Sequence, residues 1–403
     1  MVVRNVGGDG FGPVPLRQRA LAPDLARGFM LLGIALANSA IVAAAGTPAF
    51  LRPAAVSGAV VESVLFVLVH ARSFPLFAFL FGYGLVQFAF RLDSAGFGRA
   101  AVQRVLVRRN VWLAVFGFAH AALLFYGDIL TAYGLLGVLA VLVFLRLDDR
   151  LLGVVWWLYA ASAVAVAWFG WRTFVAMLDG GTASVAPSFQ GSLLTDDFWL
   201  ASGLRLWEWP QHTVFAIPAI LGIWLGMWAA RRRWLEEPER HVKRLWLVAC
   251  GGVGLAVASG VPLALIASGA VSVDAHGVDS ALQLHNNGGV FAGPGLAAVF
   301  GLVSVRIRRW RRLGVVSAVA ALGRMSLSAY LFQSVVWLVV VSRVGFGLAE
   351  SVSHPVVVVA GLAVGVWLCS VVAAAWWQRR GYRGPAELLL RRLSYGARGC
   401  RGG

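Results

Sequence analysis

The stretch from Gly117 to Gly137, GFAHAALLFYGDILTAYGLLG, places a histidine and an aspartate eight residues apart in an otherwise apolar segment. An ionisable side chain at the bilayer centre costs about 2.5–3.5 kcal/mol on insertion scales, and such residues usually face a bundle interior or a water-filled cavity. His120 and Asp128 are therefore the first candidates for a functional site. The apolar residues around them predict two membrane-spanning helices, near 110–126 and 128–145.

The composition of the whole chain is typical of an all-α polytopic membrane protein. Of its 403 residues, 59% are hydrophobic and only 13% are charged, and the apolar runs repeatedly exceed the length of a buried core helix. The formal charge of +17 comes from short basic clusters between apolar runs rather than one continuous basic face, which argues against nucleic-acid binding. The three cysteines are too scattered for a disulfide framework or a zinc site.

The apolar runs predict about ten membrane-spanning helices. The first covers about 23–45 and, lacking a cleavage pattern, is expected to be retained. The run 59–90 would measure about 48 Å as one helix, which is too long for a bilayer core of about 30 Å. We expect Pro75 to break it into a re-entrant or interfacial piece and a second helix. Further spans are expected near 151–170, 211–230, 245–269, 288–305, 314–341 and 355–377.

The basic residues predict how the helices are oriented. Cytoplasmic loops near membrane ends carry the excess of Lys and Arg. With the N-terminus inside, most of the 35 Lys and Arg residues fall on the inner side. The few that fall outside are Arg52, Arg172, Arg205 and Arg343. Both termini are therefore predicted to be cytoplasmic, with the chain crossing the cell membrane.

We divide the chain into five parts. These are a flexible cytoplasmic tail, the N-terminal helices 1–4 with the polar motifs, an extracytoplasmic loop, the C-terminal helices 6–10 and a short tail, at residues 1–20, 21–150, 171–209, 211–395 and 396–403. The loop is rich in tryptophan and mildly acidic. It either folds over the outer mouth of the bundle or supplies an interfacial tryptophan belt.

Several polar motifs occur in order along nearly the whole chain. They are Asp24-Leu-Ala-Arg27-Gly28 with Asn38, Arg72-Ser-Phe-Pro-Leu-Phe-Ala-Phe-Leu-Phe81-Gly82, Gly117-Phe-Ala-His120 with Gly127-Asp128 and Tyr133, Gly323-Arg324-Met325 with Tyr330 and Gln333, and Arg383-Gly384-Pro385. Together they resemble the YeiB-like family, also known as domain-of-unknown-function family 418. That family is distantly similar to transmembrane acyltransferases, which include the heparan-alpha-glucosaminide N-acetyltransferase and the acyltransferase-3 proteins.

The resemblance implies transfer of an acyl group from a cytoplasmic acyl-CoA to an envelope glycan, lipid or small-molecule acceptor. His120 is expected to act as general base, with Asp128 fixing its tautomer. No bound cofactor and no metal are expected, acyl-CoA being a co-substrate. The residues expected to bind substrate or donor are Arg27, Asn38, Arg72, Tyr133, Arg324 and Gln333. The inner basic residues Arg104, Arg108 and Arg109 are candidates for binding the coenzyme A phosphates.

Each candidate also has a structural interpretation. His120 could make an interhelical hydrogen bond, worth about 0.6 kcal/mol on average, and Asp128 could cap the following helix. Arg72 could snorkel to the interface, and an i,i+3 ion pair explains Asp24 and Arg27. Arg324 and Gln333, with Tyr330, could form a hydrogen-bond network. The outer-loop candidates fit no metal-ligand spacing, and they are His212, Asp274, His276, Asp279 and His285.

Two other function classes compete with an acyltransferase, and any of the three could assemble as a homo-oligomer in the lipid bilayer. A transporter of a small solute would carry helix-breaking residues at corresponding places in two halves. Ten spans divide into five and five, but the second half does not repeat the motifs of the first. A non-enzymatic membrane protein would use its polar residues only to hold the bundle together.

Overall fold

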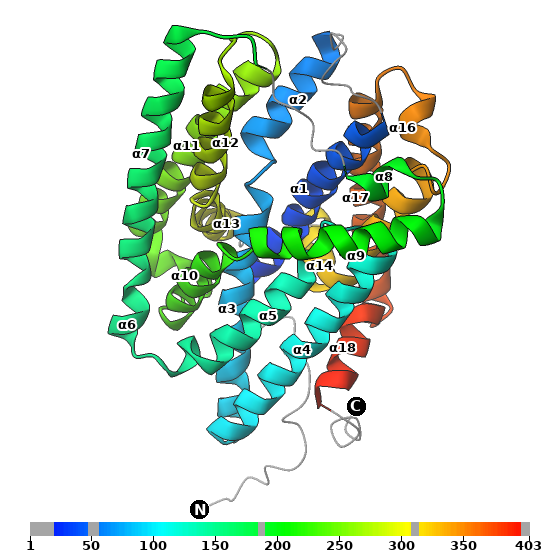
Figure 1. Ribbon diagram of the computed structural model, residues 1–403. Coiled ribbons are helices and arrows are strands. Elements are labelled where there is room, and N and C mark those ends of the chain that lie inside the picture. Colours follow the sequence, from blue (N-terminus) through cyan, green and yellow to red (C-terminus); the bar gives the residue numbers. More distant parts are fainter. Residues whose placement is uncertain (1–19, 47–55, 184–189, 308–313, 396–403) are drawn as a thin grey trace, which may run out of the picture.

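The computed structural model describes residues 20–46, 56–183, 190–307 and 314–395. Over these ranges the chain forms helices and one isolated β-bridge, between Ala183 and Val273 (Figure 1). The all-α prediction is confirmed. Apart from Ala20, the two predicted tails lie outside the described residues.

The longer helices form one bundle. In chain order the α-helices are α1 (Leu21–Gly46), α2 (Val56–Leu68), α3 (Ser73–Ser94), α4 (Arg99–Leu123), α5 (Leu130–Leu142), α6 (Asp149–Gly153), α7 (Val155–Asp179), α8 (Gly191–Leu194), α9 (Phe198–Phe215), α10 (Ala219–Arg231), α11 (Val242–Ala267), α12 (Ala275–Gly289), α13 (Ala292–Ile307), α14 (Gly314–Arg324), α15 (Ser326–Val336), α16 (Leu348–Ser351), α17 (Pro355–Arg379) and α18 (Pro385–Tyr395).

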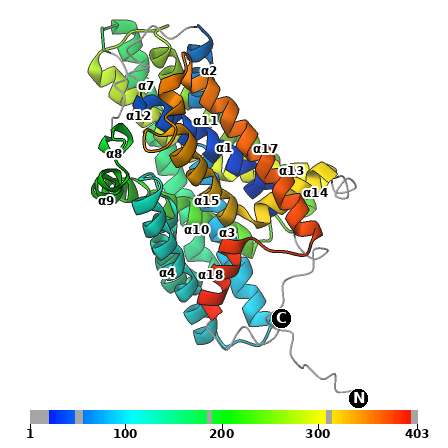
Figure 2. The same ribbon diagram turned by 90° about the vertical axis from the view of Figure 1, so that its right-hand side faces the viewer.

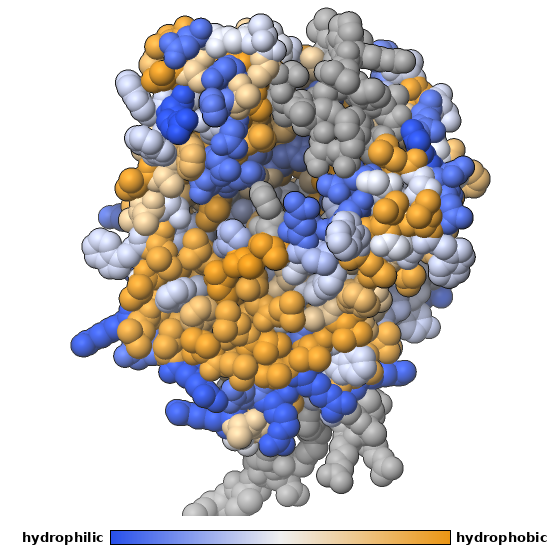
Figure 3. All heavy atoms as spheres, in the orientation of Figure 1, coloured by the Kyte–Doolittle hydropathy of each residue, from blue (hydrophilic) through white to orange (hydrophobic). Residues whose placement is uncertain are grey.

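Six helical segments are long and apolar enough to cross a membrane, and the number rises to eight if each of two bent helix pairs counts as one span. The chain is thus a multi-pass membrane protein. Figure 3 shows a broad apolar band across one face, bordered below by hydrophilic residues. α5 is apolar but short. The predicted number of about ten spans and the cytoplasmic location of both termini stay predictions.

The run 59–90 is divided between two helices, as predicted, although Gly58–Ser94 together counts as one candidate membrane span. The re-entrant or interfacial character of the first piece stays a prediction. A turn at residues 69–72 separates α2 from α3, and within it Ala71 has a positive φ of 58°. Pro75 lies in the first turn of α3, where the missing N–H of proline leaves no hydrogen bond unmade. The chain therefore breaks just before the proline rather than at it.

The segment 171–209, predicted as a loop, is largely helical. α7 continues to Asp179, and α9 begins at Phe198 and lies across the bundle (Figure 1). Trp199 and Trp207 on α9 are 74% and 85% exposed. Exposed tryptophans on such a helix fit an interfacial belt better than a closed cover.

Two predicted spans are sharply bent in the structure. The span 211–230 is divided between α9 and α10, which meet at 54°, and 314–341 between α14 and α15, which meet at 83°. Hydropathy alone cannot reveal such bends, because the apolar run continues through them. The predicted span 288–305 lies within one candidate crossing, Ala275–Ile307, which joins α12 and α13.

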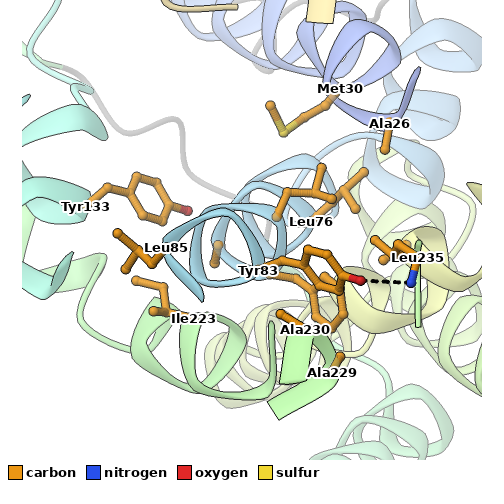
Figure 4. Close-up of a cluster of buried hydrophobic side chains, with 14 of the residues drawn as sticks. Ala26, Met30, Leu76, Tyr83, Leu85, Tyr133, Ile223, Ala229, Ala230 and Leu235 are labelled. Atoms are coloured by element: carbon orange, nitrogen blue, oxygen red, sulfur yellow. Dashed lines mark hydrogen bonds between the residues drawn. The ribbon is translucent and has the colours of Figure 1, made fainter. Parts of the chain in front are cut away.

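The bundle packs around α1 and α3. α1 contacts α13, α14 and α17, and α3 contacts α10 and α13 (Figure 2). α3 and α10 approach closely because a Cβ at Gly82 would come 2.0 Å from the Ile223 carbonyl oxygen. Such small residues let membrane helices pack backbone to backbone. In the same core Tyr83 accepts a hydrogen bond from the Leu235 N–H at 2.9 Å (Figure 4).

Candidate functional site

His120 lies in the last turn of α4 and is 2% exposed. The helix begins at Arg99, earlier than the predicted start near 110, so that His120 lies near the helix end rather than at its middle. The predicted start was wrong because it was placed where the apolar run begins. Arginine and glutamine are good helix formers, so the charged residues before that run extend the same helix.

A buried polar cluster surrounds the imidazole. His120 Nδ1 lies 3.0 Å from Asp128 Oδ1, although neither atom makes a well-aligned hydrogen bond. His120 Nε2 lies 2.7 Å from Oγ of Ser334, which belongs to α15. The structure thus brings the two predicted catalytic residues together and adds a serine. Their catalytic role stays a prediction.

Asp128 has two functions in this geometry. Its Oδ2 accepts a hydrogen bond from the Thr131 N–H at 2.7 Å, while Oδ1 faces His120. The first contact satisfies a free N–H at the start of α5, as an N-terminal cap does. The capping interpretation and the His120 partnership therefore both hold, because a carboxylate has two oxygens.

A cavity of about 860 Å³ lies beside this cluster. It extends from the exposed side chains of Arg91 and Arg233 to the buried Leu31 and Tyr330. Among the described residues, six arginines line it against three carboxylates, namely Arg27, Arg91, Arg109, Arg231, Arg233 and Arg324 against Asp24, Glu236 and Glu387. The excess of positive charge suits an anionic ligand.

The cavity and the polar cluster share a wall. Ile129 and Tyr330 line the cavity, and the Tyr330 ring packs against the His120 ring with centroids 4.8 Å apart. Ile129 directly follows Asp128 in the chain. His120 and Asp128 do not line the cavity themselves and lie one side chain behind its surface.

Asp24, Arg27 and Arg324 form a charged group at the cavity. Asp24 lies 3.7 Å from Arg27 and 3.3 Å from Arg324. Arg27 also donates to the Leu80 carbonyl at 3.1 Å, and Arg324 donates to Gln378. The i,i+3 pair expected from the sequence is present, and Asp24 also joins α1 to the end of α14.

Of the three arginines proposed for phosphate binding, one reaches the cavity. Arg109 lines it, whereas Arg104 and Arg108 are exposed and do not. Arg104 and Arg108 are four residues apart and share one exposed face of α4, whereas Arg109 is turned by about 100° from Arg108. Of the three, only Arg109 therefore faces the cavity.

The structure places Arg72 and Tyr133 away from the cavity lining. Arg72 donates to the carbonyls of His70 (2.8 Å) and Ala256, and lies 3.1 Å from Nδ1 of His285. It is 3% exposed, so it does not snorkel to water. Tyr133 is fully buried, and its hydroxyl donates to the Phe74 carbonyl at 3.0 Å. Both residues hold helices together.

Asn38 and Gln333 also lie outside the cavity lining. Gln333 is 1% exposed and donates to the Leu31 carbonyl at 3.3 Å, which ties α15 to α1. Asn38 is half-buried on α1. Of the six predicted binding residues, only Arg27 and Arg324 line the cavity.

Two residues important for the site escaped the sequence analysis. Ser334 lies in an apolar run with nothing to mark it, although it follows Tyr330 by one helical turn. Glu387 of α18 lines the cavity and accepts hydrogen bonds from the N–H groups of Leu327 (2.8 Å) and Ser328 (3.2 Å). It thereby stabilises the start of α15. Its position two residues after the Arg-Gly-Pro motif was the available signal.

These features define a class: a multi-pass helical membrane protein with a buried polar cluster beside a basic cavity. Residues 229–397 match the family described as "Protein of unknown function (DUF418)". The chain is 27% identical to "Uncharacterized protein YxaH" of Bacillus subtilis (strain 168), over 82% of this chain and 81% of that protein. It is 26% identical to "Uncharacterized protein YeiB" of Escherichia coli (strain K12), over 95% of this chain and 98% of that protein.

A shorter match, 38% identical, covers 32% of this chain and 34% of the "Uncharacterized 39.9 kDa protein in amylase 3'region" of Bacillus acidopullulyticus. No solved structure gives a significant match. These matches confirm the resemblance to the YeiB-like family that the motifs predicted.

Proposed function

We propose that this YeiB-like protein is an integral-membrane acyltransferase of the cell membrane, which takes an acyl group from a cytoplasmic acyl-CoA. The observation that carries the proposal is the arginine-lined cavity, whose inner wall is formed by Tyr330 and Ile129 directly in front of His120 and Asp128. The acceptor is an envelope glycan, a lipid or a small molecule with a free hydroxyl or amine.

The cavity suits the donor in charge and size. Coenzyme A carries phosphate groups, and planar guanidinium groups bind phosphate through paired hydrogen bonds. A volume of about 860 Å³ falls within the usual range of about 300–1,000 Å³ for small-molecule sites. With the phosphates at the exposed arginines, the acyl end would point towards Tyr330.

His120 would supply the base. With the proton on Nδ1 facing Asp128, Nε2 is the nitrogen that can accept a proton, and Ser334 Oγ lies 2.7 Å from it. The acceptor O–H or N–H gives its proton to Nε2, and the oxygen or nitrogen attacks the acyl carbon. The new C–O or C–N bond forms, the C–S bond breaks, and coenzyme A leaves as a thiol after taking the proton from the imidazolium.

Binding of coenzyme A to the purified protein tests the proposal. Arg109→Gln removes a cation that lines the cavity, and we expect it to weaken binding about tenfold, since a hydrogen bond to a charged group contributes about 1.5–3 kcal/mol. Arg108→Gln is the matched control, one residue away and exposed. Titration calorimetry measures both. No binding to the wild type, or equal loss in both variants, would overturn the proposal.

A transporter of an anionic solute is the second candidate. The bend of 83° between α14 and α15 lies at the cavity, where Gly323, Arg324 and Ser326 line it, and broken helices beside a binding site are typical of transporters. Proteoliposomes loaded with labelled acetyl-CoA distinguish the two. An acyltransferase moves the acetyl label to an acceptor, whereas a transporter moves the whole molecule across.

A further inference from the structure

Ser334 is the third member of the buried polar cluster. It is 1% exposed, and its Oγ lies 2.7 Å from His120 Nε2 and 3.3 Å from the Tyr330 carbonyl oxygen. Asp128 lies on the other side of the imidazole at 3.0 Å. A hydroxyl, an imidazole and a carboxylate in this order form the arrangement that activates a serine nucleophile.

The buried serines elsewhere in the chain show what a structural serine does here. Six of them donate to a carbonyl three or four residues earlier in the same helical segment, which satisfies the hydroxyl without another helix. These are Ser39 to Leu36, Ser259 to Ala256, Ser304 to Gly301, Ser342 to Leu338, Ser370 to Val366 and Ser394 to Leu390. Ser192 and Ser202 instead donate to Glu208 and to the Ala122 carbonyl, and neither contacts an imidazole. Ser334 has the same option, yet its shorter contact is with the imidazole of another helix.

We propose that Ser334 carries the acyl group as a covalent ester during the transfer, an inference that rests on the proposed function. Ser334 Oγ gives its proton to His120 Nε2 and attacks the acyl carbon of the thioester. The C–O bond forms, the C–S bond breaks, and the coenzyme A sulfur takes the proton and leaves as the thiol. The acceptor then gives its proton to Nε2 and attacks the acyl carbon of the ester. The new C–O or C–N bond forms, the bond between the acyl carbon and Ser334 Oγ breaks, and Oγ recovers that proton.

The start of α15 connects the cavity to Ser334. Ser326, Leu327 and Tyr330 line the cavity, and Ser334 follows Tyr330 by four residues, on the same face of the helix. Four residues of a helix correspond to a rise of about 6 Å. Tyr330 packs on His120, so its ring must turn aside for the acyl chain to reach Oγ.

A serine ester separates the two halves of the reaction. Donor and acceptor need not be bound together, because coenzyme A leaves before the acceptor arrives. In a membrane enzyme the acceptor can then approach the ester along another route. The cavity therefore has to hold only the donor.

Incubation of the purified protein with acetyl-CoA labelled in the acetyl group, without acceptor, tests the proposal. We expect a burst of about one coenzyme A thiol per protein and one covalent label that survives denaturation. The bond should resist neutral hydroxylamine, which cleaves thioesters such as those on Cys250 or Cys369, and should break in alkali. Mass spectrometry of the wild-type peptide that contains Ser334 locates the label without any variant.

Two variants complete the experiment. Ser334→Ala should lose the label and the burst, whereas the matched control Ser370→Ala should retain both. A label on another residue would overturn the covalent step at Ser334. Transfer of the acetyl group to an acceptor with no covalently labelled protein would also overturn it, and both results leave the proposed function standing. A protein that does not bind acetyl-CoA overturns both.

Discussion

At the scale of single residues, the polar side chains divide into those that serve the bundle and those that serve the site. His120→Ala tests which group the histidine belongs to. We expect acyl transfer to be abolished, while the free energy of unfolding changes by about 1 kcal/mol, since an interhelical hydrogen bond in a membrane is worth about 0.6 kcal/mol. Activity and thermal unfolding in detergent are the measurements, with the exposed His276→Ala as control. Retained activity, or unfolding, would make His120 a structural bridge.

Asp128→Asn separates the two functions of that side chain. The amide oxygen can still accept from the Thr131 N–H, so the cap and the stability should survive. The amide N–H₂ would face His120 Nδ1 and favour the tautomer with its proton on Nε2, which then cannot accept one. We expect about a hundredfold loss of transfer rate or more, with an unchanged unfolding temperature. Equal loss of stability and rate would contradict the orienting role.

The sequence identified His120 and Asp128 because ionisable residues inside apolar runs are rare enough to be noticed. It could not distinguish Arg72 and Tyr133, which join helices, from Arg27 and Arg324, which line the cavity. Arginine and tyrosine can take either position. Only the spatial arrangement decides: Arg72 is held by the carbonyls of His70 and Ala256. Ser334 carried no signal, because serines are common in membrane helices as small, self-satisfied residues.

At the scale of helices, the turn between α2 and α3 depends on Arg72. Its guanidinium joins the His70 carbonyl of the turn to Ala256 of α11 and to His285 of α12. We expect Arg72→Ala to lower the free energy of unfolding by about 2–4 kcal/mol, because several charge-assisted hydrogen bonds are lost together. Thermal unfolding measures the effect, with the exposed Arg104→Ala as control. An unchanged unfolding temperature would show that the turn is stable without the hydrogen bonds of Arg72.

The contact between α3 and α10 gives a second prediction at this scale. Gly82→Ala places a Cβ 2.0 Å from the Ile223 carbonyl oxygen, so the helices must separate, at a cost of about 1–3 kcal/mol. Gly251→Ala in α11 meets no atom within 4 Å and should leave stability equal or higher. Chemical unfolding of both variants tests this. Equal stabilities would mean that α3 and α10 are not held at this distance.

The helices that could not be predicted in full from the sequence are those that contain many charged or aromatic residues beside apolar ones. α4 begins among arginines, and α9 lies in a segment rich in tryptophan and acids, so a search for apolar runs misses the first half of α4 and most of α9. α9 is held by contacts of long range: Ser202 donates to the Ala122 carbonyl at 2.6 Å, and Arg205 to Leu123 at 3.0 Å. A buried cation at the end of α4 complements the negative end of that helix.

At the scale of the whole molecule, the location of the cavity mouth ties the proposed function to the orientation in the membrane. Arg91 and Arg233 at the mouth belong to segments predicted to be cytoplasmic. A coenzyme A donor is available only from the cytoplasm. The proposed donor therefore requires the predicted topology, in which the cavity mouth faces the cytoplasm.

Reporter fusions test this orientation. A fusion at Arg240, close to the mouth residue Arg233, and one after Tyr395 should report the cytoplasm, whereas one at Gly191 in α8 should report the outside. The physical reason is the basic bias, since most of the 35 Lys and Arg residues lie in segments of one predicted side. If the Arg240 fusion reports the outside, the arginine cavity faces away from the donor pool, and cytoplasmic acyl-CoA cannot be the substrate. If Arg240 and Gly191 report the same side, α9 and α10 do not together form one span, which would favour six or seven crossings over eight.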